Sequence, residues 1–178
     1  MTHSEGELFF DFSAARSVDK PDERNQKKAE GWKLVDFVIE EDDRVILVEI
    51  KDPSCESKLD TDDARAHLAR EREEFAKKIK DRTLITKELT PKARNSYSFL
   101  HLMKRDDKPM LYVFLLGAAK LSIDAPLLLT MKERLLDCLR QETDEPWARH
   151  YVTDCLVLTE ASWAKAFPAY PLVRRPRR

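Results

Sequence analysis

Glycine is scarce in this sequence: the chain has 178 residues, and only three of them are glycine. An all-β protein with many tight turns needs more glycine than this, so we do not expect that class. Apolar residues make up 42% of the chain, as in an ordinary globular protein, whereas charged residues reach 37% and exceed the usual quarter. The length suits one domain, so we expect residues 1–178 to fold around a single core beneath a heavily charged surface.

Cysteine and long apolar runs are also rare. The three cysteines, Cys55, Cys138 and Cys155, are odd in number and far apart, and no cysteine or histidine has the spacing of zinc ligands. No apolar run approaches the roughly 18 residues of a membrane span. The first residues lack the basic start and apolar stretch of a secretory signal. We therefore expect a cytoplasmic protein that has no disulfide framework and no membrane partner.

The net charge is also small, since 32 basic and 33 acidic residues leave a formal charge of only -1. The local distribution of charge has to be considered instead. Basic residues gather between 65 and 105, where interleaved glutamates are typical of a solvated helix face. A second group lies in the tail and has no compensating acid: Arg174, Arg175, Arg177 and Arg178. This tail either contacts nucleic acid loosely or is a disordered solubilising end, and we take it as the candidate nucleic-acid contact.

Hydrophobic patterning predicts strands that alternate with helices. The predicted strands are 32–40, 44–51, 110–117 and 151–158, and the predicted helices are 62–81, 92–104 and 125–141. Residues 7–12 fit either a strand or the start of a helix, and 21–30 have a helical pattern. Thr159 is expected to cap a short helix that stops before Pro168. This order predicts an α/β fold with a mixed central sheet flanked by helices.

The first two predicted strands carry an unusual set of charges. If they form a hairpin whose loop is Asp42 and Asp43, Asp36 lies directly opposite Glu49. Side chains alternate between the two faces of a strand, so Glu49 and Lys51 share the face that holds Asp36. That face also carries Leu34, Val38 and Leu47, whereas the opposite face carries Val35, Phe37, Ile39, Ile46, Val48 and Ile50, which we expect to be core.

Two opposed carboxylates among apolar neighbours repel each other and are costly unless they bind something. A hard divalent cation, Mg²⁺ or Mn²⁺, would cancel the repulsion because it prefers carboxylate oxygens. With Lys51 beside them, the carboxylates can bind a phosphodiester, activate a water molecule and stabilise the negative charge of the transition state. The alternative is an ordinary salt-bridged face in which Lys51 neutralises Glu49.

Asp36, followed after twelve residues by Glu49-Ile50-Lys51, resembles the catalytic signature of the PD-(D/E)xK, or restriction-endonuclease-like, nuclease superfamily. In that superfamily the signature lies on a hairpin, which a helix and then a buried strand follow, as predicted here for 62–81 and 110–117. The resemblance covers roughly residues 20–117 and implies a restriction-endonuclease-like core, in which a helix and a further strand precede the hairpin. Val35 stands where the signature often has proline.

The same resemblance implies roles for individual residues. Asp36 and Glu49 would be metal ligands, the backbone carbonyl of Ile50 would complete the site, and Lys51 would position or activate the attacking water. Many members use a further acid on the preceding helix, for which Glu23 or Glu30 is the candidate here.

The resemblance therefore favours a Mg²⁺- or Mn²⁺-dependent nuclease that hydrolyses phosphodiester bonds, in DNA rather than RNA, either alone or as a homodimer. Catalytically inactive members of the superfamily also exist. The alternative is thus a nuclease-fold protein that serves as a binding or assembly subunit of a defence or repair complex. An unrelated α/β ligand-binding domain is a third interpretation.

Overall fold

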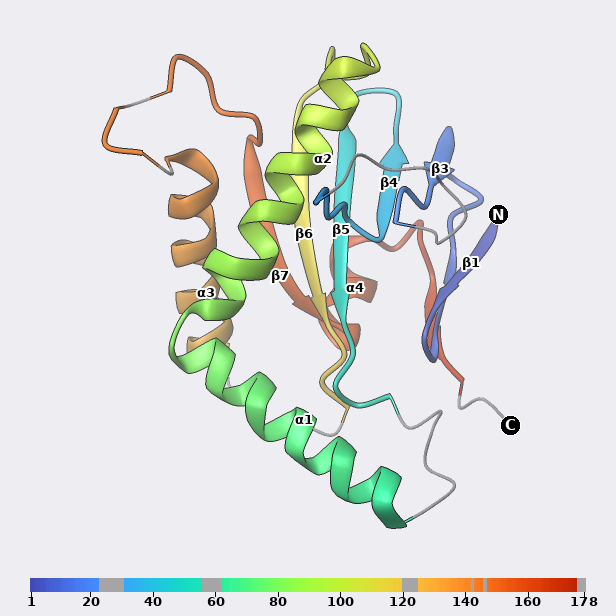
Figure 1. Ribbon diagram of the computed structural model, residues 1–178. Coiled ribbons are helices and arrows are strands. Elements are labelled where there is room, and N and C mark those ends of the chain that lie inside the picture. Colours follow the sequence, from blue (N-terminus) through green and yellow to red (C-terminus); the bar gives the residue numbers. More distant parts are fainter. Residues whose placement is uncertain (23–30, 56–61, 120–124, 142, 146, 176–178) are drawn as a thin grey trace.

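A mixed five-stranded sheet forms the centre of the fold (Figure 1). In spatial order its strands are β3 (Ser17–Asp19), β4 (Phe37–Glu40), β5 (Val45–Lys51), β6 (Met110–Leu116) and β7 (Asp154–Thr159). The strands β3, β4 and β5 are antiparallel neighbours, whereas β6 runs parallel to both β5 and β7. The computed structural model describes residues 1–22, 31–55, 62–119, 125–141, 143–145 and 147–175.

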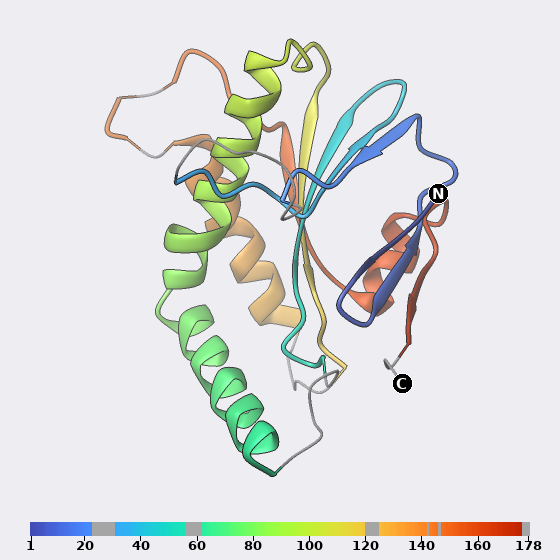
Figure 2. The same cartoon turned by 45° about the vertical axis from the view of Figure 1, so that its right-hand side comes forward.

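Helices lie on both faces of this sheet. They are α1 (Asp62–Lys80), a π-helical turn η1 (Ile85–Leu89), α2 (Thr90–Leu102), α3 (Ala125–Arg140) and α4 (Glu160–Ala166). Figure 2 shows α2 and α3 on one side of the sheet and α4 on the other. Beside α4 lies a small antiparallel sheet of β1 (Thr2–Glu5), β2 (Leu8–Asp11) and β8 (Leu172–Arg174). The predicted α/β class, with a mixed sheet flanked by helices, is confirmed.

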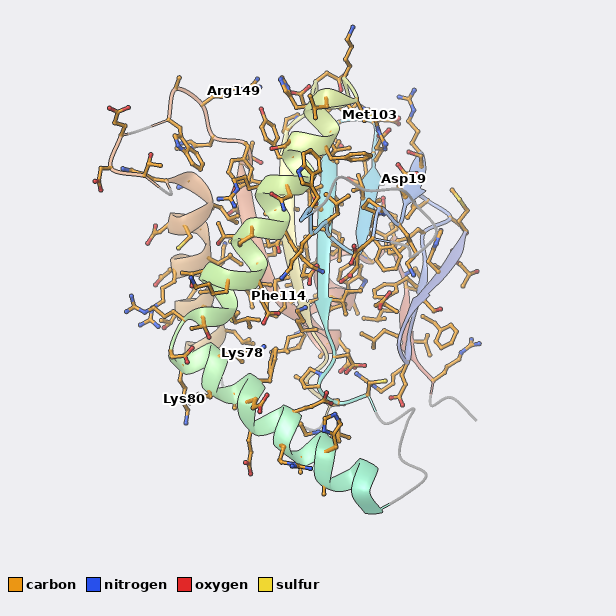
Figure 3. All side chains as sticks on the ribbon, viewed as in Figure 1. Asp19, Lys78, Lys80, Met103, Phe114 and Arg149 are labelled. Atoms are coloured by element: carbon orange, nitrogen blue, oxygen red, sulfur yellow. The ribbon has the colours of Figure 1, made fainter. Side chains whose placement is uncertain are left out.

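The central sheet separates two layers of apolar side chains. On the side of α2 and α3, Leu47 and Phe114 pack with Leu135, and Figure 3 labels Phe114 within this layer. On the other side, Val113 packs with Trp163 of α4 and with the small sheet. Because β6 contributes to both layers, nearly all of its side chains are buried, as its continuous apolar run predicted. In the described part of the chain, no helix has both the length and the apolarity that crossing a membrane requires.

The hairpin of β4 and β5 has the predicted register. Phe37 pairs with Val48. Extending this register by one residue places Asp36 opposite Glu49. The loop at the other end is the predicted pair Asp42–Asp43, since the flanking residues close it with a backbone hydrogen bond of 2.9 Å. The sequence therefore predicted the facing of the two carboxylates correctly.

The first strand of this hairpin is shorter than predicted, because side chains replace part of its backbone pairing. β4 begins only at Phe37. Before it, the N–H of Val35 donates to Ser96 Oγ of α2 over 2.9 Å, and the N–H of Ile50 donates to Asp36 Oδ2 over 2.6 Å. Val35 consequently packs on the α2 side of the sheet. The prediction that it shares a face with Phe37 was wrong.

Several other boundaries differ from the predictions. The helical segment expected at 92–104 begins earlier, with η1, and ends at Leu102, and the strand expected at 151–158 is β7, which begins at Asp154. The strands β1, β3 and β8 were not predicted, since they are short and form through pairing with neighbours. Thr159 caps α4 as expected, and its side chain accepts a hydrogen bond from the N–H of Ser162. The helix expected at 21–30 lies almost wholly outside the described residues.

Candidate functional site

The carboxylates of Asp36 and Glu49 lie together near the carboxyl end of β5. Asp36 stands directly before β4 and is fixed by the hydrogen bond from the N–H of Ile50. The Glu49 side chain has 0% exposed surface, because it points into the layer beneath α2. Two residues further along, Lys51 brings its Nζ within 3.2 Å of Glu49 Oε1. The structure thus brings together the three charged residues that were predicted to share a face.

A lysine of α2 completes this cluster. The Nζ of Lys92 lies 2.8 Å from Glu49 Oε1, 2.9 Å from Glu49 Oε2 and 3.7 Å from Asp36 Oδ1. Asp22 Oδ2 lies 3.9 Å from the same nitrogen. The ammonium group of Lys92 therefore lies between the carboxylates and offsets their repulsion.

The π-helical turn η1 brings a further acid to the cluster. Its residues Ile85 and Leu89 are buried and hold the turn against the core. Between them, Glu88 places Oε2 3.3 Å from Lys51 Nζ and Oε1 2.8 Å from Lys78 Nζ. Lys51 is thus held between Glu49 and Glu88.

The roles of Glu88 and Lys92 were not predicted from the sequence. The available signal was a spacing of four residues: Glu88, Lys92 and Ser96 recur beside the buried positions Leu89 and Ala93. Residues four apart lie on one helix face, so this polar row borders the apolar face that packs on the sheet. Glu88 and Lys92 contact the hairpin cluster, and Ser96 binds its backbone.

The electrostatics of the cluster follow from its burial. Burial raises the pKa of Glu49 to about 7, and the neighbouring charge of Asp36 adds to this rise, while Lys92 and Lys51 oppose it. Burial also raises the pKa of Asp36, in spite of Lys92 and the N–H of Ile50. Burial disfavours the charged form of Lys51, but Glu49 and Glu88 outweigh it and raise the pKa of that ammonium. The site therefore attracts positive charge.

The oxygen atoms of this site fit a hard divalent cation. Glu49 Oε1 is buried and, among the described residues, accepts no hydrogen bond of good geometry, although both ammonium groups lie near it. The N–H and C=O of one strand residue point to the same side, so the carbonyl of Ile50 is directed toward Asp36, where β4 pairing has ended. Carboxylate and carbonyl oxygens are ligands that Mg²⁺ and Mn²⁺ accept. Lys92 now supplies the positive charge that such an ion would supply.

The further acid that the resemblance implied is not located. Glu23, the first candidate, and Glu30 both lie outside the described residues. The described acid nearest to them in sequence is Asp22, whose carboxylate approaches Lys92.

Arg174, in the basic tail, forms ion pairs with three acidic residues of the folded protein. Its guanidinium lies 3.0 Å from Glu7 Oε2, 2.8 Å from Asp52 Oδ1 and 2.7 Å from Glu160 Oε1. The side chains of Glu7 and Asp52 are only 5% and 8% exposed, so the arginine neutralises two buried acids. Arg175 instead lies 5.5 Å from the ring of Phe9. Arg177 and Arg178 lie outside the described residues.

A second acidic group, Glu7, Asp52 and Cys55, has ligand atoms within 4.8 Å of one another. Arg174 already bridges Glu7 and Asp52, so we assign this group to the packing of β8 against the rest of the fold. Gly117 is part of the same arrangement, because a Cβ atom there would come within 2.1 Å of Asp52 Oδ1.

Removing the arginine should expose its structural role. Arg174→Met leaves Glu7 and Asp52 buried without their cation, so we expect the free energy of unfolding to fall by about 3 kcal/mol. Arg175→Met is the matched control and should cost about 0.5–1 kcal/mol, since it removes only a contact with an aromatic ring. Urea unfolding of both variants measures the difference. Equal losses would contradict the structural assignment.

The raised pKa of Glu49 predicts a pH-dependent stability in the absence of metal. The folded protein keeps a proton that the unfolded chain releases near pH 4.5, so the free energy of unfolding falls between about pH 4.5 and about pH 7 and then levels off. Glu49→Gln removes this titration. We expect the variant to match wild type near pH 5 and to be more stable near pH 8, by on the order of 3 kcal/mol. Thermal melts in EDTA measure both.

Glu88→Gln is the control for this experiment. Partial burial disfavours the charge of Glu88, but Lys78 and Lys51 outweigh it and hold the pKa of this carboxyl below its ordinary value. Neutralising Glu88 should therefore lower the stability near pH 8, the reverse of Glu49→Gln. A Glu49→Gln protein that is less stable than wild type near pH 8 would show that the carboxylate is favourably buried.

Comparison with known proteins does not assign the chain to a family. No protein-family model, no curated protein and no solved structure matches it. Its function has to be inferred from the geometry and the electrostatics of the cluster around Glu49.

Proposed function

We propose that the protein is a nuclease of the PD-(D/E)xK type that uses Mg²⁺ or Mn²⁺ to hydrolyse phosphodiester bonds, with DNA as the expected substrate. The observation that carries this proposal is the pair of the partly buried Asp36 and the fully buried Glu49, with Lys51 beside it. Two acids that are costly to bury, and whose pKa values are raised, are typical of a functional site.

The order of the secondary structure supports the proposal. A further strand, β3, precedes the hairpin and pairs with β4. Helices α1 and α2 follow, and β6 then pairs parallel to β5. The strand before the hairpin, the helices after it and the parallel strand β6 match what the resemblance implies, whereas the described residues before β4 contain no helix.

The metal would be held by the carboxylates of Asp36 and Glu49 and by the carbonyl of Ile50. When bound, it would polarise the phosphate and lower the pKa of a water molecule. Lys51 reaches the same place and can donate hydrogen bonds to that water or to a phosphate oxygen. Glu88 helps to orient the Lys51 ammonium from the other side.

Hydrolysis would then proceed by attack of water in line with the leaving oxygen. The bond between the water oxygen and phosphorus forms as the bond to the leaving oxygen breaks. One proton leaves the water, and one proton is taken up by the leaving oxygen. Lys51 and Lys92 lie where their charges can stabilise the additional negative charge on the phosphate.

The position of Lys92 favours a second candidate function. Its ammonium already neutralises Asp36 and Glu49, which is what a salt-bridged, catalytically inactive protein of this fold would contain. Such a protein would act as a binding or assembly subunit, for example in a defence or repair complex. A nuclease assay on DNA and RNA, with Mn²⁺ and with EDTA, separates the two candidates.

Loss of Lys51 should abolish most of the cleavage. We expect Lys51→Ala to reduce the rate by on the order of 10²–10³, because the variant lacks a donor for the water or the phosphate. Metal binding should persist, since Lys51 is not a ligand. Lys80→Ala, on the exposed side of α1, is the control and should cleave like wild type. Near-normal cleavage by Lys51→Ala would remove this lysine from the mechanism.

Metal binding can be tested without a substrate. Mn²⁺ should raise the melting temperature of wild type, because binding to the folded state alone stabilises it by about 2.7 kcal/mol at a hundredfold excess over Kd. Asp36→Asn removes a ligand charge, so the shift should largely vanish. Without metal the variant should melt at or above the wild-type temperature, since one repelling charge is gone.

The salt-bridged alternative gives the opposite pattern in the same melts. It predicts no Mn²⁺ shift in wild type and a neutral or destabilising effect of Asp36→Asn. A wild-type protein that is indifferent to millimolar Mn²⁺ would leave the inactive subunit as the better interpretation.

A further inference from the structure

A pocket with an unusual charge lies beside the carboxylate cluster. It has a volume of about 410 Å³ and is lined by Lys33, Lys51, Lys78, Thr83, Lys87, Glu88 and Lys92. Five of these seven residues are lysines, and they come from the segment before β4, from β5, from α1, from η1 and from α2. A cleft lined mainly by one sign of charge raises the local concentration of ions of the opposite sign, so this pocket favours an anion.

The lysines of the pocket differ in how their charge is compensated. Lys51 and Lys92 contact Glu49, and Lys78 contacts Glu88. Lys33 and Lys87 are exposed and, within the part of the chain that the structure describes, make no ion pair. Positive charge is therefore left over, and it belongs to Lys33 and Lys87, which are both exposed.

We propose that this pocket binds the terminal phosphate of a nucleic-acid chain, and that the protein therefore acts at chain ends. The proposal rests on the nuclease function in taking nucleic acid as the carrier of the phosphate. A terminal phosphomonoester has a charge of about -1.5 to -2 at neutral pH and three acceptor oxygens. An internal phosphodiester has a single charge, so a surplus of lysines discriminates in favour of the chain end.

The place of the pocket explains how an end could direct cleavage. Lys51 and Lys92 belong both to the pocket and to the carboxylate cluster. A phosphate held in the pocket therefore lies next to the bond-breaking residues, and a neighbouring phosphodiester of the same chain reaches Asp36 and Glu49. The volume is at the small end of the range for ligand pockets, about 300–1,000 Å³, which suits one phosphate with part of its nucleotide.

Binding in EDTA tests the proposal without cleavage. The probes are a short single-stranded oligonucleotide with a 5′-phosphate, the same with a 3′-phosphate, and the same with hydroxyl groups at both ends. We expect a phosphate at one of the ends to lower Kd by about tenfold or more. Equal affinity of wild type for all three probes would overturn the proposal and would mean that internal phosphates alone are bound.

Substitutions in the pocket test whether its lysines cause the preference for a terminal phosphate. Lys33→Ala combined with Lys87→Ala should remove the preference for a terminal phosphate, and both side chains are exposed, so the fold should persist. Lys80→Ala is the matched control, because Lys80 projects away from the body of the protein, whereas Lys78, on the same helix, lines the pocket (Figure 3). A double variant that keeps the preference would locate the phosphate elsewhere and overturn the proposal.

A third experiment tests phosphate binding separately from the nuclease function. Inorganic phosphate should raise the melting temperature of wild type in EDTA, and the double variant should lose that shift. Phosphate binding without cleavage under any metal would support the pocket and reject the nuclease. Cleavage without any preference for phosphorylated ends would reject the pocket and leave the nuclease standing.

Discussion

The repulsion between Asp36 and Glu49 is the constraint on which the rest of the site depends. The register of the hairpin sets these carboxylates opposite each other, and the packing of α2 removes Glu49 fully and Asp36 largely from water. Burying two like charges is affordable only with a cation between them. Lys92 supplies that cation from α2, and Lys51 supplies a second from β5. The ion pairs thus tie α2 to the sheet at the place where chemistry is proposed.

The surrounding fold keeps this balance in place from several directions. The N–H of Ile50 holds one carboxylate, and Ser96 holds the backbone just before it. The π-helical turn η1 widens the start of the helical segment, and π-helical turns are frequent at functional sites. It brings Glu88 toward Lys51, so that the lysine has an acid on each side. The charged side chains of this site are therefore held in place mainly by packed helices and strands.

The geometry of the hairpin could be predicted from the sequence because it depends only on residues that are close together in the chain. Strand alternation and a two-residue loop determine which side chains share a face, so the meeting of Asp36, Glu49 and Lys51 was predictable. The apolar run of β6 and the cap at Thr159 were predictable for the same reason. These features need no knowledge of distant contacts.

Other features depend on contacts between distant segments and could not be predicted in this way. Lys92 lies 43 residues from the glutamate that it neutralises. The short strands β1, β3 and β8 exist because they pair, and their own sequences are weakly patterned. Arg174 looked like a free basic tail residue, since its acidic partners Glu7 and Asp52 are remote in sequence.

The bridge made by Arg174 has a consequence for the rate of folding. The separation from Asp52 is 122 residues and the separation from Glu7 is 167. Contacts between residues so far apart raise the contact order, and folding slows as contact order rises. Asp52 directly follows Lys51, so the docking of β8 fixes the chain just after the strand that carries this lysine. The chain beside the charge cluster is thus held in part by a segment from the far end of the sequence.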